Sequence, residues 1–516
     1  MAVRQLRPAA LPMAALLVTA MSVAVAAVGP TTAAADPAEP VCTPLHVVGV
    51  QGTNQSAPDA SPTTDSGFLG DAVLGPLLKT AGGNISREYV PYAGDFGWRG
   101  ETYEQSMLGG VDKATQVLSD YASRCPDARF AIVGYSQGGQ IADILARNIG
   151  AGDGPVKADQ VAAVSLFSSP NRPDGASTFP DAPGRTSPLA PEGVPADALS
   201  DLTVEVEPPA EGGGIAPNIA SASGYGELAG RVASWCGEGD LACATPEDAP
   251  LARTVTNIAG QLHLEAQDPQ QTLLDLTGAL GGAVLRTGAD VINNDINFSG
   301  GRFQVTQSGQ TVLGRLADNS DPRSATPEAD AEIIRAVIKT GVMGFQAGVA
   351  IAKKVLTPEN IGQLAAVGLA NPPAALGLLA LKVGDAALDL FPPATGREVE
   401  RYIYKEVTRG VQDNKGLLKM ATDLKYWDAA RNHAVYDVNV VDAVGRTAAG
   451  FTVAWLTEIA AALTDTTPPT TSKSTSRASV TTSPTPTRAP ASTSPSTTTS
   501  STRTPITTAS GSASSG

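Results

Sequence analysis

Histidine and cysteine are both scarce in this sequence, and each scarcity limits the chemistry that the chain can carry out. The 516 residues include three histidines, so a reaction that needs an imidazole must use His46, His263 or His433. The four cysteines are Cys42, Cys125, Cys236 and Cys243. Their spacing lacks the closer pairs of a typical zinc site. An even number suits two disulfides in an oxidising compartment, and the sequence alone leaves all pairings open.

Basic residues are also fewer than acidic ones. The chain has 36 lysines and arginines against 51 aspartates and glutamates, a formal charge of −15. Such a chain lacks the positive charge that binds a phosphate backbone, so we expect no nucleic-acid partner. Purely electrostatic binding to anionic lipid is disfavoured for the same reason.

Long apolar runs are missing everywhere except near the N-terminus. Arg4 and Arg7 precede an apolar run from Leu11 to Val28, and the small residues 33–35 follow. This pattern predicts a secretory signal peptide over residues 1–35. No later segment has the roughly 18 continuous apolar residues of a membrane span, so we expect an exported, soluble protein.

The segment from Arg129 to Asn148 has the pattern of a strand, a sharp turn and a helix. An apolar run ends at Gly134, the sequence GYSQG follows, and apolar residues then recur at helical spacing. Gly-x-Ser-x-Gly at such a turn is a nucleophile elbow, in which a strained backbone exposes the Ser136 hydroxyl. Gly134 and Gly138 omit side chains that would collide with the neighbouring strand and helix. We therefore predict that Ser136 is a nucleophile; the alternative is an ordinary turn with a capping serine.

The same segment resembles the cutinase family of secreted serine esterases. Cys125-Pro126 followed by FAIVGYSQGG carries the resemblance, which extends over about residues 42–250 and 425–460. It implies an α/β-hydrolase with Cys42–Cys125 and Cys236–Cys243 disulfides. The hydrophobic pattern agrees with an α/β fold, because strand-like and helical segments alternate. We expect a three-layer parallel sheet with helices on both faces, including strands over 45–50, 86–90, 130–133 and 161–167 and a helix over 106–123.

The residues expected to form an oxyanion hole are Thr53 and Gln137. The Gln137 backbone N–H directly follows the nucleophile. Cutinases place a small hydroxyl residue after a glycine at the end of the first strand, and Thr53 matches that position. The family often has an arginine before this glycine and an acidic residue just after it, whereas this chain has Gln51 and Asn54. A turn or capping threonine is the alternative interpretation of Thr53.

An acidic residue stands between the last two cysteines. Residues 234–243 read SWCGEGDLAC, and a disulfide across this stretch would close a small loop around Asp240. A closed loop fixes a carboxylate, as the acid that orients a catalytic histidine requires. Cutinases carry their catalytic aspartate in the same Cys-x3-Asp-x2-Cys setting. We predict Asp240 as this acid, with Glu238 as its nearest rival.

Two histidines follow this acid, as the chain order of an α/β-hydrolase triad requires. His433 lies in NHAVY, which resembles the His-x-x-Tyr of the cutinase catalytic loop, and an apolar helical stripe follows it. His263 lies nearer to Asp240 but has no such surroundings. We predict His433 as the base, with His263 as the alternative. His46 falls inside the first strand and is interpreted as structural.

This choice of base divides the chain into five parts. After the signal peptide we expect a first part of the hydrolase core over 36–250, a helical insertion over 251–425, and completion of the core over 426–463. A Thr/Ser/Pro-rich tail over 464–516 cannot form a packed core. The insertion precedes the predicted base, so we expect it to cap the active site. The alternative is a helical domain packed elsewhere.

The resulting prediction is a secreted serine carboxylesterase or lipase that hydrolyses lipid-like or polyester esters, as in lipid degradation. We expect a monomer that needs no metal or organic cofactor. The tail is expected to associate it with the cell envelope, and a plain disordered tail is the alternative. An acyltransferase with the same triad and an alcohol acceptor is the nearest alternative. A non-catalytic, envelope-bound lipid-binding or structural protein is the other.

Overall fold

The computed structural model describes most of the predicted hydrolase core and part of the predicted insertion. The described residues are 42–205, 209–216, 224–246, 248–264, 269–299, 302–305, 309–339 and 429–466, with isolated positions and short runs between 354 and 423. The signal peptide predicted over 1–35 and nearly all of the predicted tail lie outside the described residues. The chain divides after Thr467 into two units, and the second lies wholly outside them.

A five-stranded parallel sheet forms the centre of the first unit. Its strands lie in the order β2-β1-β3-β4-β5. They span Leu45–Val50 (β1), Ile85–Tyr89 (β2), Arg129–Tyr135 (β3), Val161–Phe167 (β4) and Val232–Trp235 (β5). The order reverses between β1 and β3, and ligands of open α/β sheets bind where the carboxyl ends of the strands meet such a reversal. The fold is therefore the α/β-hydrolase type that the sequence predicts.

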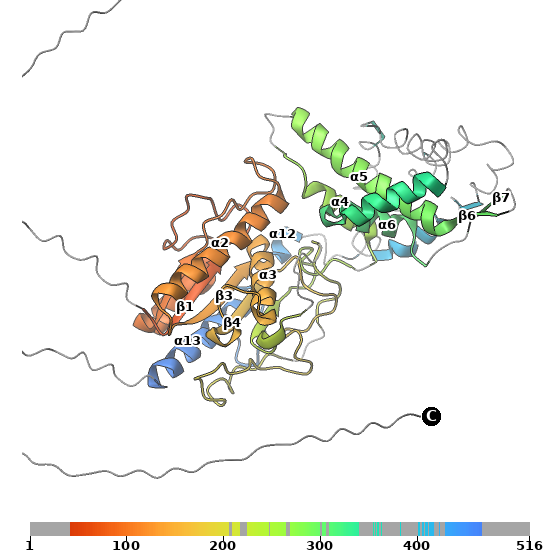
Figure 1. Ribbon diagram of the computed structural model, residues 1–516. Helices are drawn as coiled ribbons and strands as arrows, with labels where there is room; N and C mark the ends of the chain where they lie inside the picture. Colours follow the sequence, from red (N-terminus) through yellow and green to blue (C-terminus); the bar gives the residue numbers. More distant parts are fainter. Residues whose placement is uncertain are drawn as a thin grey trace, which may run out of the picture. The chain divides into compact units, whose positions relative to one another are not determined.

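Helices cover both faces of the sheet, because strands such as β1 and β4 are apolar and buried along their whole length. One face carries α2 (Tyr103–Arg124) and α3 (Gln137–Ala151), packed on a core that includes Phe130 and Ile132. The other face carries α1 (Gly75–Ala81) and α13 (Ala448–Thr466). Figure 1 shows α2 and α3 in front of the strands and α13 behind them.

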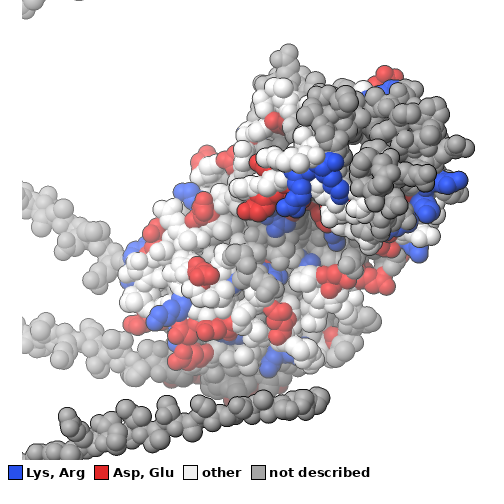
Figure 2. All heavy atoms as spheres, turned by 45° about the vertical axis from the view of Figure 1, so that its right-hand side comes forward, with Lys and Arg blue, Asp and Glu red and all other residues white. Residues whose placement is uncertain are grey.

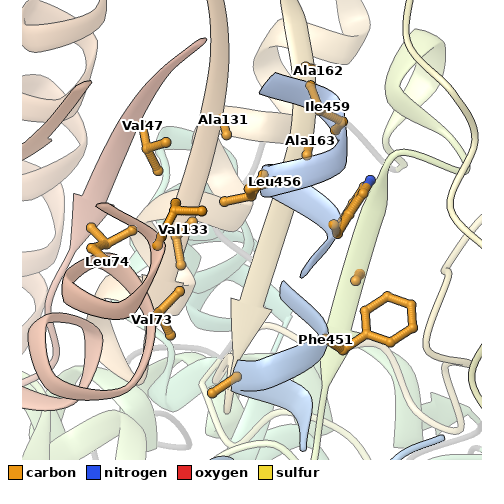
Figure 3. Close-up of a cluster of buried hydrophobic side chains, with 14 of the residues drawn as sticks. Val47, Val73, Leu74, Ala131, Val133, Ala162, Ala163, Phe451, Leu456 and Ile459 are labelled. Atoms are coloured by element: carbon orange, nitrogen blue, oxygen red, sulfur yellow. The ribbon is translucent and has the colours of Figure 1, made fainter. Parts of the chain in front are cut away.

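Helix α13, near the C-terminal end of the described residues, packs in the hydrophobic core on the second face of the sheet. Leu456 and Ile459 of this helix point toward the sheet near Ala163, whereas the Phe451 ring lies beside β5, with its centroid 5.3 Å from that of Trp235 (Figure 3). Trp455 in the same helix is also fully buried. Burying such large side chains stabilises the fold by about 1.5–3 kcal/mol each. Residues 448–466 are therefore an integral part of the core, and the helix extends past the boundary that we expect at 463.

The described part of the insertion is mainly helical. It contains α4 (Pro250–Ala259), α5 (Pro269–Asp295), α6 (Val312–Ser320), the short turn η5 (Pro322–Ser324) and a hairpin of β6 (Ile296–Ser299) and β7 (Arg302–Val305). The Asn257 side chain joins α4 to α6 by donating to Ala317 O and Ser320 Oγ, each at 3.0 Å. Most of residues 340–428 lie outside the described part of the chain.

Two backbone hydrogen bonds join the start of the insertion to residues 97–104 of the hydrolase core. Leu264 N–H donates to Gly97 O at 2.5 Å, and Glu104 N–H donates to Gly260 O at 3.3 Å. A Cβ on Gly97 would lie 2.3 Å from Leu262 O, so a glycine is needed for this close approach. The start of the insertion is thus held against the loop that leads into α2.

Charged side chains of both signs lie on the surface of the described residues. On the face drawn in Figure 2, acidic and basic side chains are interspersed among other residues. No helix in the described ranges is long and apolar enough to cross a membrane.

Candidate active site

Ser136 lies at a strained turn between β3 and α3. Its backbone has φ 55° and ψ −123°, outside the regions that L-residues favour. A Cβ on Gly134 would lie 2.3 Å from Gly138 O, and a Cβ on Gly138 would lie 2.1 Å from Val50 O. Both glycines are therefore required by close packing against helix and strand, as the sequence pattern predicts. The turn has the geometry of a nucleophile elbow.

The structure brings Ser136, His433 and Asp240 into one hydrogen-bonded line. His433 Nε2 lies 2.9 Å from Ser136 Oγ, and His433 Nδ1 lies 3.0 Å from Asp240 Oδ1. The serine follows β3, the aspartate follows β5, and the histidine follows α12 (Ala429–Asn432). The His433 side chain keeps 29% of its surface exposed, whereas Asp240 is buried. The ring can therefore contact both a ligand and a water-shielded carboxylate.

Three donors surround the Asp240 carboxylate. His433 Nδ1–H and the Ala242 N–H, at 3.0 Å, reach Oδ1, while the Tyr436 hydroxyl donates to Oδ2 at 2.6 Å. The Tyr436 hydroxyl in turn accepts the Gly237 N–H at 3.2 Å. Burial raises the pKa of Tyr436 well above its ordinary value, so its proton stays available for donation. Tyr436 thereby fixes the carboxylate that faces His433.

Two disulfides support this arrangement. Cys236 pairs with Cys243 around Asp240, and Cys42 pairs with Cys125. Both pairings are those implied by the resemblance. The Cys236–Cys243 disulfide joins cysteines that are seven positions apart, so it closes a short loop and restricts the movement of Asp240 within it.

The two residues expected at the oxyanion hole lie beside the serine. Gln137 opens α3, and the first N–H groups of a helix have no carbonyl partner within that helix. Its side chain is buried and donates to Asp95 O at 3.1 Å and to Tyr103 O at 3.2 Å. Thr53 follows β1, and its hydroxyl lies 3.5 Å from Gln137 Oε1. Both residues are thus placed at the mouth of the elbow.

A comparison with known protein families agrees with this geometry. The sequence model of the family described as Cutinase matches residues 41–255. The chain therefore contains a cutinase-like domain over these residues. The match contains Thr53, Ser136 and Asp240 but ends before most of the insertion and before His433.

Curated relatives of the cutinase domain include bacterial and fungal esterases. The Culp6 carboxylesterase homolog of Corynebacterium glutamicum is 28% identical over 214 residues, or 40% of this chain and 66% of the relative. Carboxylesterase Culp1 of Mycobacterium tuberculosis is 29% identical, over 30% of this chain and 63% of the relative. Cutinase CUT1 of Coprinopsis cinerea is 35% identical, over 22% and 55%. The chain thus spans about two thirds or less of these relatives.

Solved structures with similarity to the chain include an acetylxylan esterase at 0.90 Å resolution. It has 19% sequence identity and a TM-score of 0.28, and the match covers 46% of this chain and 99% of that one. Lysin B from Mycobacteriophage D29 has 15% identity and a TM-score of 0.29, with coverage of 57% and 91%.

A pocket of about 360 Å³ opens beside the hydrogen-bonded line of Ser136, His433 and Asp240. Core residues line one part of it, including Thr53, Ser136 and His433. Residues of the insertion line another part, namely Thr256, Asn257, Gly260, Gln261, Asp321 and Pro322. The described start of the insertion therefore forms a wall of the pocket. Its volume falls in the range of small-molecule sites.

The aromatic loop after β2 contributes unequally to this pocket. Phe96 lines it, whereas Trp98 is 50% exposed and Tyr92 is buried with its hydroxyl 2.6 Å from Gln51 O. The buried Asp95 carboxylate fixes the loop by accepting the N–H groups of Phe96, Trp98, Arg99 and Glu101. Of the three aromatic residues in this loop, only Phe96 is a lining residue.

The rival residues have other partners. His263 Nδ1 lies 2.7 Å from Asp275 in α5. Burial acts to raise the pKa of Asp275, but hydrogen bonds from His263 and Gln271 lower it below its ordinary value. His46 is buried in β1, and Glu238 is exposed on the disulfide loop. Neither histidine nor Glu238 lines the described pocket.

Two further side chains hold His433, and the sequence pattern alone does not predict either contact. The Tyr135 hydroxyl donates to the His433 carbonyl oxygen at 2.8 Å. The Ser168 hydroxyl lies 2.8 Å from His433 Nδ1. Tyr135 belongs to the GYSQG motif, so its position next to the predicted nucleophile is the only sequence feature that could suggest a contact with His433. Ser168 lies in a Ser-Ser-Pro stretch, which suggests an ordinary turn.

Among the described residues, no group of three or more His, Cys, Asp or Glu could hold a metal ion.

Proposed function

We propose that this chain is a secreted serine carboxylesterase that cleaves lipid-like or polyester esters through an acyl-enzyme. The observation that carries the proposal is the line from Ser136 Oγ through His433 to Asp240, with spacings of 2.9 and 3.0 Å. In the first step Ser136 Oγ attacks the ester carbonyl carbon while His433 Nε2 takes the hydroxyl proton. Asp240 holds the ring in the required tautomer and stabilises the imidazolium.

The negative charge of the tetrahedral intermediate needs donors at the elbow. Backbone N–H of Gln137 and either N–H or hydroxyl of Thr53 are the groups that we assign to it. Loss of one such donor typically lowers turnover by about 10²–10³-fold. His433 then returns its proton to the leaving alcohol oxygen. Water, deprotonated by the same ring, attacks the acyl carbon and releases the acid and Ser136.

The pocket supports an apolar acyl group as the substrate moiety. Its lining includes the apolar side chains of Phe96, Ile215, Leu241 and Pro322. Such a surface favours a hydrocarbon chain over a charged group, because burial of a charge without a partner is costly. The insertion supplies part of this wall, and we propose that it acts as the cap of the acyl site.

Export and wall association form part of the same proposal. Two disulfides suit an oxidising compartment outside the cytoplasm. The N-terminal pattern supports secretion, and the Thr/Ser/Pro-rich tail supports a spacer or tether in the cell envelope.

A chromogenic short-chain ester assay tests the reaction and its base together. Ser136→Ala and His433→Ala should each lower kcat by at least about a thousandfold, because each removes a member of the triad. His263→Ala should keep turnover near that of the wild type, because this ring binds Asp275. Circular dichroism would check that each variant is folded.

Two outcomes would count against the proposal. Equal rates from the wild type and Ser136→Ala would favour a non-catalytic lipid-binding protein. Abolition of turnover by His263→Ala alone, in a folded protein, would show that His433 is not the base.

A further inference from the structure

Ser168 lies directly after β4, at the same edge of the sheet as the catalytic line. Its side chain is fully buried. The hydroxyl lies 2.8 Å from His433 Nδ1, while the carboxylate of Asp240 lies 3.0 Å from the same nitrogen. Because a neutral histidine whose Nε2 accepts from Ser136 carries its proton on Nδ1, that proton has two acceptors. The ring is therefore held by a hydroxyl as closely as by a carboxylate.

The backbone of Ser168 is in an unusual conformation for a serine. Its φ is 53°, and the described non-glycine residues with positive φ are Asn54, Ser136, Ser168 and Asp181. Two of these four are therefore the serines that contact the two ring nitrogens of His433. A glycine would adopt this φ without steric cost, so the side chain of Ser168 is kept despite strain. Backbone strain retained beside reacting groups points to a functional use of the side chain.

The carboxylate that shares His433 Nδ1 with Ser168 is itself held by a second side chain. Tyr436 donates to Asp240 Oδ2 at 2.6 Å, and Asp240 Oδ1 accepts from His433. Ser168 and Asp240 can thus share the Nδ1 proton of His433, while Tyr436 fixes the carboxylate.

We propose that Ser168 is a positioning residue for the catalytic base, acting with Asp240 to hold the Nδ1 side of His433. This inference rests on the proposed esterase function. When Ser136 attacks, its proton moves to Nε2, its oxygen forms the bond to the acyl carbon, and the carbonyl electron pair moves to the oxyanion. The resulting imidazolium has an Nδ1–H shared between Ser168 Oγ and Asp240 Oδ1. A hydrogen bond to a charged donor is stronger than one to a neutral donor, so Ser168 favours the transition state over the ground state.

The test compares Ser168→Gly with Ser168→Ala. Both remove the hydroxyl, but glycine also relieves the positive-φ strain. We expect both variants to lower kcat about tenfold for a short-chain chromogenic ester, with KM unchanged, because the lost bond forms most strongly after proton transfer. We expect Ser168→Gly to keep or raise the unfolding temperature. Labelling of Ser136 by a fluorophosphonate probe should slow by a similar factor in both variants.

Ser169→Ala is the matched control. Ser169 is the neighbouring buried serine, and its hydroxyl accepts the Asn171 N–H at 3.3 Å. This substitution should leave kcat within about twofold of the wild type. A Ser168→Gly enzyme with wild-type kcat would overturn the inference, as would a rise in KM that accounts for the whole loss. Should Ser168→Ala fail to fold, Ser168→Gly decides alone. A wild type without esterase turnover would instead refute the proposed function itself.

Discussion

His46 is a buried imidazole with no assigned role in catalysis. It stacks on Tyr121 with ring centroids 3.5 Å apart, and its Nδ1 lies 2.8 Å from Ser86 Oγ. Its Nε2 is 3.8 Å from Glu88, too far for a hydrogen bond that would offset burial. Burial, with a smaller effect of Arg124, lowers the pKa of His46 from 6.5 to about 3. The ring is therefore neutral in the folded protein over most of the acidic range.

This shift predicts a loss of stability in acid. Between pH 6.5 and about 3 the unfolded chain binds a proton on His46 and the folded chain does not. The free energy of unfolding must then rise with pH across this window and fall as the pH is lowered, by about 1.4 kcal/mol per pH unit from this group. His46→Phe keeps an aromatic ring but cannot titrate, so its unfolding free energy should have a smaller slope by this amount.

Urea unfolding at a series of pH values would measure the difference. Ser86→Ala is the control, because it removes the hydrogen-bond partner of His46 but leaves the ring to titrate. It should keep the pH slope of the wild type. Equal slopes for His46→Phe and the wild type would show that His46 is not buried in a neutral form.

At the level of single residues, the sequence identifies those side chains that lie in a recognisable local pattern. Ser136 has the elbow glycines, Asp240 has the flanking cysteines, and the structure places both beside His433. Ser168 has no such pattern, because its importance comes from where β4 ends relative to α12. A contact between residues 265 positions apart depends on the tertiary fold and has no local sequence signal.

Among the elements, hydrophobic pattern and length decide which ones the sequence predicts. β1 and β4 are six and seven residues long, are mainly apolar and buried throughout, and have the bounds that we predict. β5 has only four residues, Val232–Trp235, and its serine and the following cysteine break the apolar run. We did not predict this strand from the sequence, although it carries Asp240 at its carboxyl end. The β6–β7 hairpin lies in the polar, glycine-rich segment 293–312.

Helix α4 gives a prediction at this scale, because its C-terminal end lines the pocket. Gly260 is the C-cap of α4, and a Cβ there would have Thr256 O at 3.3 Å and Tyr103 Cβ at 3.9 Å as neighbours. A larger side chain can therefore be placed at this position with a small adjustment. Gly260→Leu should narrow the pocket and lower kcat/KM about tenfold for a long acyl chain, with a change below twofold for an acetyl ester.

Val255→Leu is the control for this substitution. Val255 is 61% exposed on α4, so the added volume enters solvent and not the pocket. The Val255→Leu enzyme should have the same preference between a dodecanoyl and an acetyl ester as the wild type. An unchanged preference in a folded Gly260→Leu enzyme would mean that acyl chains do not pass along α4.

At the scale of the whole molecule, the sequence shows least directly which distant segments of the chain meet in the fold. His433 stands 297 positions after Ser136, yet their side chains lie 2.9 Å apart. The intervening insertion leaves the core at β5 and returns before α13, whose burial completes the second core layer. Resemblance to a family predicts this return through His-x-x-Tyr. It gives no information on the insertion, whose helices follow from periodicity and capping threonines such as Thr326, which accepts the Ala329 N–H at 3.2 Å.

Excision of about residues 255–422 tests whether the insertion governs substrate choice. It removes the pocket wall formed by Gly260, Gln261 and Pro322 but leaves the triad, both disulfides and α13 in the chain. We expect the shortened enzyme to hydrolyse an acetyl ester within about tenfold of the wild type. Its preference for a dodecanoyl over an acetyl ester should fall by at least about tenfold, because about 1.4 kcal/mol of apolar contact corresponds to that factor. Circular dichroism and fluorophosphonate labelling would establish that the core is folded with a reactive serine. A folded, reactive enzyme with unchanged preference would show that the insertion packs beside the site without selecting the acyl chain.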